Sequence, residues 1–114
     1  MALTEIEHID VEMEACMDNC LEAAQACENC ADACAEEGEE MARCIRLCRD
    51  VADLATLHAR FMARNSAFHD DLAAITADAA EECAKECANH DHDHCQLCAE
   101  ILPDCVETCR EMAV

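Results

Sequence analysis

The spacing of cysteine is the feature of this sequence that most constrains its fold. Along the run CMDNCLEAAQACENCADAC, from Cys16 to Cys34, successive cysteines are three, four or seven residues apart, and later stretches repeat these intervals. Residues at such intervals share one face of an α-helix. The chain has one glycine, one proline, no tryptophan and no tyrosine. Disulfide scaffolds are rich in loops and turn residues, so this composition predicts an all-α protein instead.

Four helices are predicted in a single domain that comprises residues 1–114, a length typical of one domain. Thr4 with Glu7 forms a capping box at the start of the first helix, and Gly38 is a natural C-cap at its end. An Asn-Ser pair and an HDHD run mark the later breaks. The predicted helices comprise residues 4–37, 39–64, 66–89 and 93–112.

Short connections between these helices favour an antiparallel up-down-up-down four-helix bundle. The first helix is the longest, so residues 4–12 should overhang the bundle or form a separate short segment that packs across one end or onto another subunit. Asp93 with Gln96 could cap the last helix. Pro103 lies inside that helix and, because it has no N–H group, predicts a kink or an interruption there.

Every cysteine falls on a single stripe of its helix, and in a bundle that stripe faces the core. Four facing stripes predict a tube lined with sulfur. Packing alone explains this poorly, because Leu or Ile would bury more apolar area at each position. The residues are Cys16, Cys20, Cys27, Cys30, Cys34, Cys44, Cys48, Cys83, Cys87, Cys95, Cys98, Cys105 and Cys109.

Disulfides within a helix are also a poor explanation. A helical CxxxC pair has Cβ atoms roughly 5–6 Å apart, whereas a disulfide needs about 3.5–4.5 Å. Disulfides between helices would require an oxidising compartment.

The thiols have the chemistry of metal ligands. Zinc and iron–sulfur sites usually take their cysteines from knuckles or loops, whereas soft thiolates select Cu(I). Each Cu(I) would displace about one proton from a thiol, which keeps the interior near neutral. The sequence therefore predicts that the chain stores multiple Cu(I) ions on cysteine thiolates, with a thiol redox, iron–sulfur or zinc-binding protein as the alternative. It shows no nucleophile–base pair and no phosphate loop, so we do not expect an enzyme.

The acidic composition argues against partners that need a basic surface. With 27 acidic residues against seven basic ones, the formal net charge is -20, which disfavours nucleic acid and an anionic membrane surface. No stretch approaches a membrane span, and the N-terminus has neither the basic nor the apolar region of a signal peptide. We therefore expect a cytoplasmic protein with reduced thiols.

The combined motifs resemble those of the bacterial copper storage proteins, which are cysteine-rich four-helix bundles that hold many Cu(I) ions. The resemblance rests on the first run of five cysteines and on CIRLC, CAKEC, HDHDHCQLC and CVETC further along. It extends over nearly the whole chain. It implies a Cu(I)-binding bundle of the cytosolic type, whose members form tetramers.

At one end of the expected bundle, methionine and histidine continue the cysteine stripes. Antiparallel packing places only four of the thirteen cysteines toward this end. The resemblance implies that copper enters at a Met- or His-bearing end, which makes these residues candidate ligands; ordinary core packing is the alternative. They are Met13, His58, Met62, His69 and Met112. At the other end, His94 beside Cys95 is a further candidate ligand within a histidine run that could also be a solvated linker.

A homo-oligomer is expected from apolar residues outside the cysteine stripes. Leu47, Leu54 and Phe61 recur every seven residues. Three apolar residues of the overhanging N-terminus, Leu3, Ile6 and Ile9, have no obvious partner within four short helices. Both sets could instead close the bundle. The resemblance implies that the oligomer is a tetramer.

Overall fold

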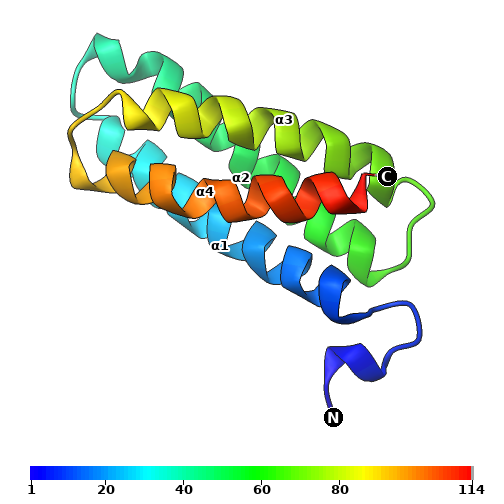
Figure 1. The fold of residues 1–114 in the computed structure, drawn as a ribbon. Helices are drawn as coiled ribbons and strands as arrows, with labels where there is room; N and C mark the ends of the chain where they lie inside the picture. The colour runs from blue at the N-terminus through cyan, green and yellow to red at the C-terminus, as the bar shows by residue number, and fades with distance from the viewer. Residues whose placement is uncertain (114) are drawn as a thin grey trace.

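Four long helices lie side by side in the computed structural model, which describes residues 1–113 (Figure 1). Each long helix packs against two others, in the closed order α1, α2, α3, α4 and back to α1. The predicted antiparallel up-down-up-down bundle is therefore confirmed. Val114, the last residue of the predicted domain, lies outside the described residues. The helices are α1 (Val11–Cys34), α2 (Ala42–Ala63), α3 (His69–Ala88) and α4 (Asp93–Met112), with the short 3₁₀-helices η1 (Leu3–Glu5) before α1 and η2 (Glu39–Met41) before α2.

The first long helix begins later than the sequence predicts. α1 starts at Val11, where the carboxylate of Asp10 accepts a hydrogen bond of 2.8 Å from the N–H group of Met13. A side-chain cap of this kind stabilises a helix start by about 1 kcal/mol. The predicted start at residue 4 is wrong because this second capping residue begins the continuous helix, while Thr4 lies inside the short η1, which ends at Glu5.

The segment before α1 packs across the end of α2, which was one of the two expectations for it. The side chain of Ile9 is buried. Nε2 of His8 lies 3.0 Å from the carbonyl oxygen of Met62 and 3.2 Å from that of Ala63. The last carbonyls of a helix lack a full set of partners, so an imidazole N–H group can donate to them there.

Three further helix ends differ from the predictions by three residues each. α2 begins at Ala42 rather than at residue 39, because residues 39–41 form the 3₁₀-helix η2. α1 ends at Cys34, three residues early, and the chain turns at Gly38, whose φ of 104° lies in the region that favours glycine. α3 begins at His69 rather than at residue 66. The Ser66 hydroxyl accepts a hydrogen bond from the N–H group of Phe68, which holds these residues in a turn before the helix.

The fourth helix begins at Asp93 as predicted, but with a different cap. Its N-cap residue is His92, without a side-chain hydrogen bond. The side chain of Gln96 donates instead to the carbonyl of His90, at 2.6 Å. The predicted Asp93–Gln96 cap is therefore wrong.

Pro103 does not interrupt α4, which continues to Met112. The predicted interruption is wrong, and Figure 1 shows α4 as one continuous helix. Pro103 is on the exposed face of the helix. Water can therefore bond to the carbonyl that the missing N–H group leaves free one turn earlier.

Small side chains let the four helices approach closely. Besides cysteine, alanine is the commonest residue of the buried core, and few large side chains are fully buried. Because the distance between helix axes depends on the side chains at the contact, this composition brings facing sulfur atoms together. Within the described residues, no helix combines the length and the apolar character that crossing a membrane requires.

Candidate metal centre

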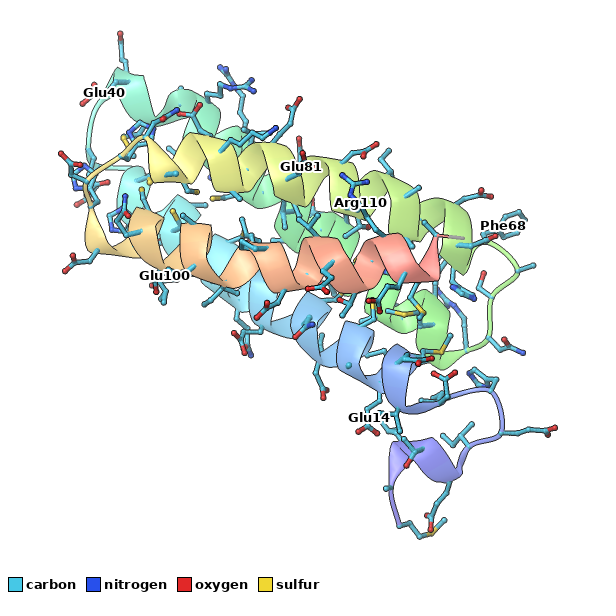
Figure 2. The ribbon with its side chains drawn as sticks, in the orientation of Figure 1. Glu14, Glu40, Phe68, Glu81, Glu100 and Arg110 are labelled. Carbon is cyan, nitrogen blue, oxygen red and sulfur yellow. The ribbon has the colours of Figure 1, made fainter. Side chains whose placement is uncertain are left out.

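All thirteen cysteine side chains point into the bundle. Each is fully buried, with 0% of its surface exposed, and each is a free thiol. The charged side chains point outward, as Glu14, Glu81, Glu100 and Arg110 do in Figure 2. The predicted cysteine-lined core is confirmed.

One set of thiols, here called the four-cysteine group, lies between α1 and α4 toward the start of α1. Cys109 is at its centre. Its sulfur lies 3.8 Å from that of Cys16 and 3.7 Å from that of Cys20, and 3.9 Å from that of Cys105. His58 of α2 joins the group, because its Nδ1 lies 3.5 Å from the sulfur of Cys20 and 3.6 Å from that of Cys109.

The remaining thiols, here called the nine-cysteine group, extend toward the other end. The closest sulfur pairs in this group join α2 to α3. Cys48 and Cys83 are 3.6 Å apart, and Cys44 and Cys87 are 3.7 Å apart. The group comprises Cys27, Cys30, Cys34, Cys44, Cys48, Cys83, Cys87, Cys95 and Cys98.

Two sulfurs belong to more than one set of converging ligands. In each set, three or four donor atoms lie within 4.8 Å of one another. Cys30 and Cys48 each occur in two of the sets, so that ions bound in neighbouring sets would share a thiolate. The sets are Cys16, Cys20, His58 and Cys109; Cys30, Cys44, Cys48 and Cys87; Cys30, Cys34, His94 and Cys95; and Cys27, Cys48 and Cys98.

A layer without sulfur separates the two groups. On α1 and on α4, the last cysteine of one group and the first of the other are seven positions apart, with six residues between them, which is about 10 Å along a helix. These stretches bury Ala23 and Leu102, and the facing stretches of α2 and α3 bury Val51, Ala55 and Ala77. The sulfur lining is therefore interrupted. α2 and α3 supply thiols to the nine-cysteine group alone, as the antiparallel order of the helices predicts.

The sulfur–sulfur distances suit a bridging metal better than a disulfide. The closest pairs are 3.6–4.0 Å apart, against about 2.05 Å in a disulfide. Two metal–sulfur bonds of about 2.3 Å each span up to about 4.6 Å. A cation could therefore bind between paired sulfurs with only small side-chain movements.

Burial keeps part of the nine-cysteine group protonated. Burial is the main cause that raises the pKa of Cys34 to about 11, and it also raises the pKa of Cys95. Removing a thiolate from water without a counter-charge is unfavourable. These thiols are therefore neutral at pH 7 until a cation displaces the proton.

Hydrogen bonding divides the four-cysteine group into acidic and basic members. Bonds with Cys109 and Cys20 lower the pKa of Cys16 to about 3 and that of Cys105 to about 4. The pKa values of Cys20 and Cys109 are raised, chiefly by bonds with Cys105. A thiolate here is stabilised only while neighbouring S–H groups keep their protons.

The predicted methionine and histidine ligands lie at the end of the bundle beyond the four-cysteine group. Met13, His58 and Met62 are buried, and His69 and Met112 are half-buried. The rings of His58 and His69 are stacked, with centroids 6.5 Å apart and planes at 23°.

At the opposite end, His94 reaches the sulfurs of the nine-cysteine group. Its Nε2 also lies 3.0 Å from one carboxylate oxygen of Glu37, and Nδ1 of His92 lies 3.2 Å from the other. His90 pairs with Glu86 at 2.7 Å, which raises the pKa of His90. The sequence analysis missed both glutamates.

The fold and these thiol groups match one family of known proteins. Its sequence model, described as copper storage protein, matches residues 9–114. The chain belongs to the copper storage protein family.

Solved structures agree with this assignment. Copper storage protein 3 of Bacillus subtilis, in its Cu(I)-bound form, is 41% identical over 90% of this chain and 99% of its own, with a TM-score of 0.85. The copper storage protein of Streptomyces lividans loaded with ten copper equivalents is 32% identical over 97% of this chain and 95% of its own, with a TM-score of 0.88. A structure of the cytosolic S. lividans protein with five coppers is 34% identical over 90% of this chain and 92% of its own, with a TM-score of 0.85.

Proposed function

We propose that this copper storage protein holds several Cu(I) ions on the thiolates of its core and acts as a store rather than as an enzyme. The observation that best supports the proposal is that neighbouring ligand sets share sulfur atoms. Cys30 and Cys48 each belong to two ligand sets, so the nine-cysteine group is a connected array instead of an isolated site. A sensor or a carrier needs one site, whereas connected thiols provide capacity. The copper-bound relatives support the same cargo.

The thiols supply both affinity and charge balance for this cargo. Thiolate is a soft ligand and selects Cu(I) over harder cations. An empty thiol whose pKa is raised by burial, such as that of Cys34, is neutral and needs no counter-ion, and each Cu(I) that arrives there displaces about one proton. Full burial of the sulfurs also shields bound Cu(I) from water and oxidants. All thirteen cysteines and, at the two ends, Met13, His58, Met62, His69, His94 and Met112 are the proposed ligands.

The thiol arrangement does not favour the alternative cofactors. A structural zinc site is almost always a closed tetrahedral set of four ligands, and iron–sulfur clusters are held by cysteines in loops that wrap around them. Here the thiols project from the middle of continuous helices and are shared between sets.

We place this store in the cytoplasm. The S. lividans relative is described as cytosolic. Thirteen free thiols also need a reducing compartment, since sulfurs on neighbouring helices are close enough to cross-link after small movements in an oxidising one.

The homo-oligomer, a tetramer by resemblance to the family, is proposed to form through α2. This helix contains four of the six arginines and only two acidic residues, whereas α1 contains six acidic residues and no basic one. Two copies that each carry a net charge of -20 repel one another. The α2 surface is where that repulsion is weakest.

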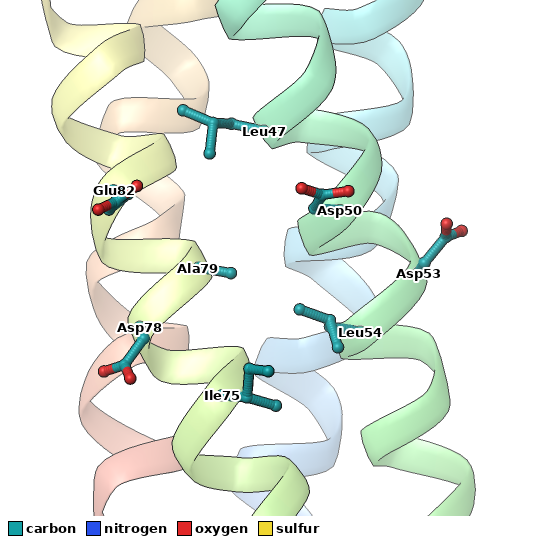
Figure 3. A pocket seen from close by; sticks show the side chains of 8 residues that line it. All are labelled: Leu47, Asp50, Asp53, Leu54, Ile75, Asp78, Ala79 and Glu82. Carbon is teal, nitrogen blue, oxygen red and sulfur yellow. The ribbon is translucent and has the colours of Figure 1, made fainter.

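A groove between α2 and α3 offers the apolar area for such a contact (Figure 3). Leu47, Leu54 and Ile75 point into it, and Ile75 is 53% exposed. Acidic side chains stand at the edges, among them Asp50 and Asp53. The arginines on α2 of a second copy complement this acidic edge, so we propose that a second copy of the chain packs into the groove.

The third residue of the predicted apolar stripe lies apart from this groove. The guanidinium of Arg64 covers the ring of Phe61, at 4.5 Å from the ring centroid. A covered ring offers less area to a partner. The proposed contact therefore depends on the other two members of the stripe.

Anomalous scattering at the copper absorption edge would test the storage proposal directly. Crystals of copper-loaded protein should show several copper peaks in each thiol group. The double variant Cys16→Ser, Cys109→Ser should lose the peaks of the four-cysteine group and keep the others, because an apolar layer separates the groups. A single copper peak per chain in the unmodified protein would refute storage.

A further inference from the structure

The layer between the two thiol groups offers copper no soft ligand. The four helices pass through it with residues 21–26, 49–57, 70–82 and 99–104, and these stretches contain no cysteine, methionine or histidine. Their buried side chains, all of which the structure describes, are those of alanine, valine and leucine, with Thr76 as the one polar exception. The Thr76 hydroxyl donates to the carbonyl of Leu72 at 2.7 Å, and an oxygen atom is too hard a ligand to suit Cu(I).

The layer is also wider than one bound metal ion can bridge. Cys20 and Cys27 are seven positions apart on α1, as are Cys98 and Cys105 on α4, which is about 10 Å along each helix. A cation bound between two sulfurs spans up to about 4.6 Å. Among the residues that the structure describes, the close sulfur pairs and the converging ligand sets all stay within one group or the other.

Within one group, an ion can move from sulfur to sulfur without losing all its ligands. A bond to an incoming sulfur forms while a bond to an earlier sulfur breaks, and the proton of the incoming thiol passes to the sulfur that is released. Charge stays balanced, and copper keeps its oxidation state. The exchange requires sulfurs about as close as those of Cys48 and Cys83, which are 3.6 Å apart.

The same exchange cannot cross the layer. An ion that entered it would have to leave its sulfurs before it met new ones, and an unpaired charge in an apolar interior is strongly unfavourable. Ala23, Val51 and Leu102 are each fully buried there. Because these side chains have no contact with bulk water, water could not solvate the ion on its way.

Building on the proposed storage of Cu(I), we propose that the two thiol groups are separate stores that do not exchange copper inside the bundle. The four-cysteine group exchanges ions with the solution at the end of the bundle where α1 begins, and the nine-cysteine group does so at the opposite end. Each group therefore fills and empties at its own rate, whatever the occupancy of the other. One chain holds a small store and a larger one.

The two stores should release copper at different rates. The four-cysteine group has one converging ligand set, whereas three sets meet in the nine-cysteine group and share the sulfurs of Cys30 and Cys48. An ion among shared sulfurs has other thiols within reach when one bond breaks, so it is recaptured more often before a chelator removes it. We therefore expect the nine-cysteine group to empty more slowly.

A single substitution should join the two stores. Elsewhere on α1 the cysteines follow steps of three and four residues, and Ala23, which is fully buried, divides the one step of seven into three and four. Ala23→Cys therefore completes the thiol stripe between Cys20 and Cys27. Ala31→Cys is the matched control, because it adds a buried thiol to the same helix but beside the nine-cysteine group, where it bridges nothing.

Withdrawal of copper from the loaded, reduced full-length protein tests the proposal. A strong Cu(I) chelator is added in excess and its absorbance follows release with time, while spectra of ¹³C-labelled cysteine identify the group that each phase empties. We expect two phases in the unmodified protein and in Ala31→Cys. In Ala23→Cys the slow phase should be lost, because ions of the nine-cysteine group can then also leave through the other end.

A single phase in the unmodified protein, with both groups emptying together, would overturn the proposal. Two phases that Ala23→Cys leaves unchanged, or that Ala31→Cys alters equally, would overturn it as well, because the missing thiol would then not be what separates the groups. If Ala23→Cys loses its helical circular dichroism, the double variant Ala23→Cys, Leu102→Cys replaces it, since the smaller side chain makes room for the added sulfur. Failure of the storage proposal is distinguishable, because the chelator would then recover only one or two ions per chain.

Discussion

The sulfur atoms of Cys16 and Cys109 lie 3.8 Å apart, although 93 positions separate the two residues in the chain. They meet because the start of α1 and the end of α4 are antiparallel neighbours. Such a pair converges only when the whole bundle has formed. The fold therefore brings the sulfur ligands together, and it should do so in the copper-free protein as well.

The empty, reduced protein should already be folded and helical. Neutral thiols are acceptable small apolar groups in a core, and neither the cap at Asp10 nor the alanine-rich interfaces involve a metal. Far-ultraviolet circular dichroism of the copper-free protein should show a mostly helical spectrum that changes little on loading. A spectrum dominated by coil, with helix appearing only as copper is added, would place the chain among proteins that fold on their metal.

Leu102 should be important for stability and unimportant for capacity. It is fully buried in the layer between the thiol groups, so Leu102→Ala should lower the free energy of unfolding of the empty protein by about 2–5 kcal/mol. Denaturant unfolding measures this loss. Leu97→Ala is the control, because Leu97 lies on the same helix with 46% of its surface exposed and should change stability by about 0.5 kcal/mol or less. A large fall in copper capacity for Leu102→Ala would show that the layer does more than separate the groups.

The stability of the empty protein should fall on both sides of neutral pH. Burial raises the pKa of Cys34 to about 11 from an ordinary value of 9.0, so the unfolded chain loses this proton first and stability decreases as pH rises above about 9. Burial lowers the pKa of His58 from 6.5. The unfolded chain therefore gains that proton first, and stability also decreases as pH falls below 6.5.

Thermal unfolding of the reduced protein across this pH range checks both slopes. Cys34→Ala should flatten the alkaline slope, and His58→Gln should flatten the acid one. If stability rose steadily from pH 8 to 11 in the unmodified protein, the buried thiols could not be neutral in the folded state.

The proposed oligomer contact predicts a charge-sensitive assembly. Leu54→Asp and Ile75→Asp would each add a negative charge inside the groove, and we expect both variants to sediment as smaller species than the unmodified protein at micromolar concentration. Leu21→Asp, on the exposed side of α1, adds the same charge elsewhere and should leave the assembly intact. A monomeric unmodified protein would refute the contact.

Sequence periodicity was sufficient for the bundle and for the orientation of the thiols, because the three-, four- and seven-residue steps determine a helix face wherever the helix begins. It was not sufficient for the start of α1, since Thr4 and Asp10 are both good capping residues and only their tertiary contacts choose between them. The contacts that decide where α1 begins include those of His8 with the end of α2. Pro103 was misjudged for a related reason, because its effect depends on whether the freed carbonyl faces water.

Whether a contact in the site could be predicted depended on how far apart its two residues lie in the sequence. The pairing of His90 with Glu86 follows a helical four-residue step and could have been predicted. The contact of His94 with Glu37 joins residues 57 positions apart, and no local pattern indicates it. The stacking of His58 on His69 likewise depends on how α2 and α3 pack.

Anaerobic titration of the reduced protein with Cu(I), against a competing chelator, tests the central claim most directly. Buried thiols that share their sulfurs should take up on the order of one Cu(I) per cysteine, with about one proton released per ion. Saturation at many ions per chain, reached without a large change in helicity, is the predicted result. Saturation at one or two ions would contradict storage and would make the protein a sensor or a carrier of copper instead.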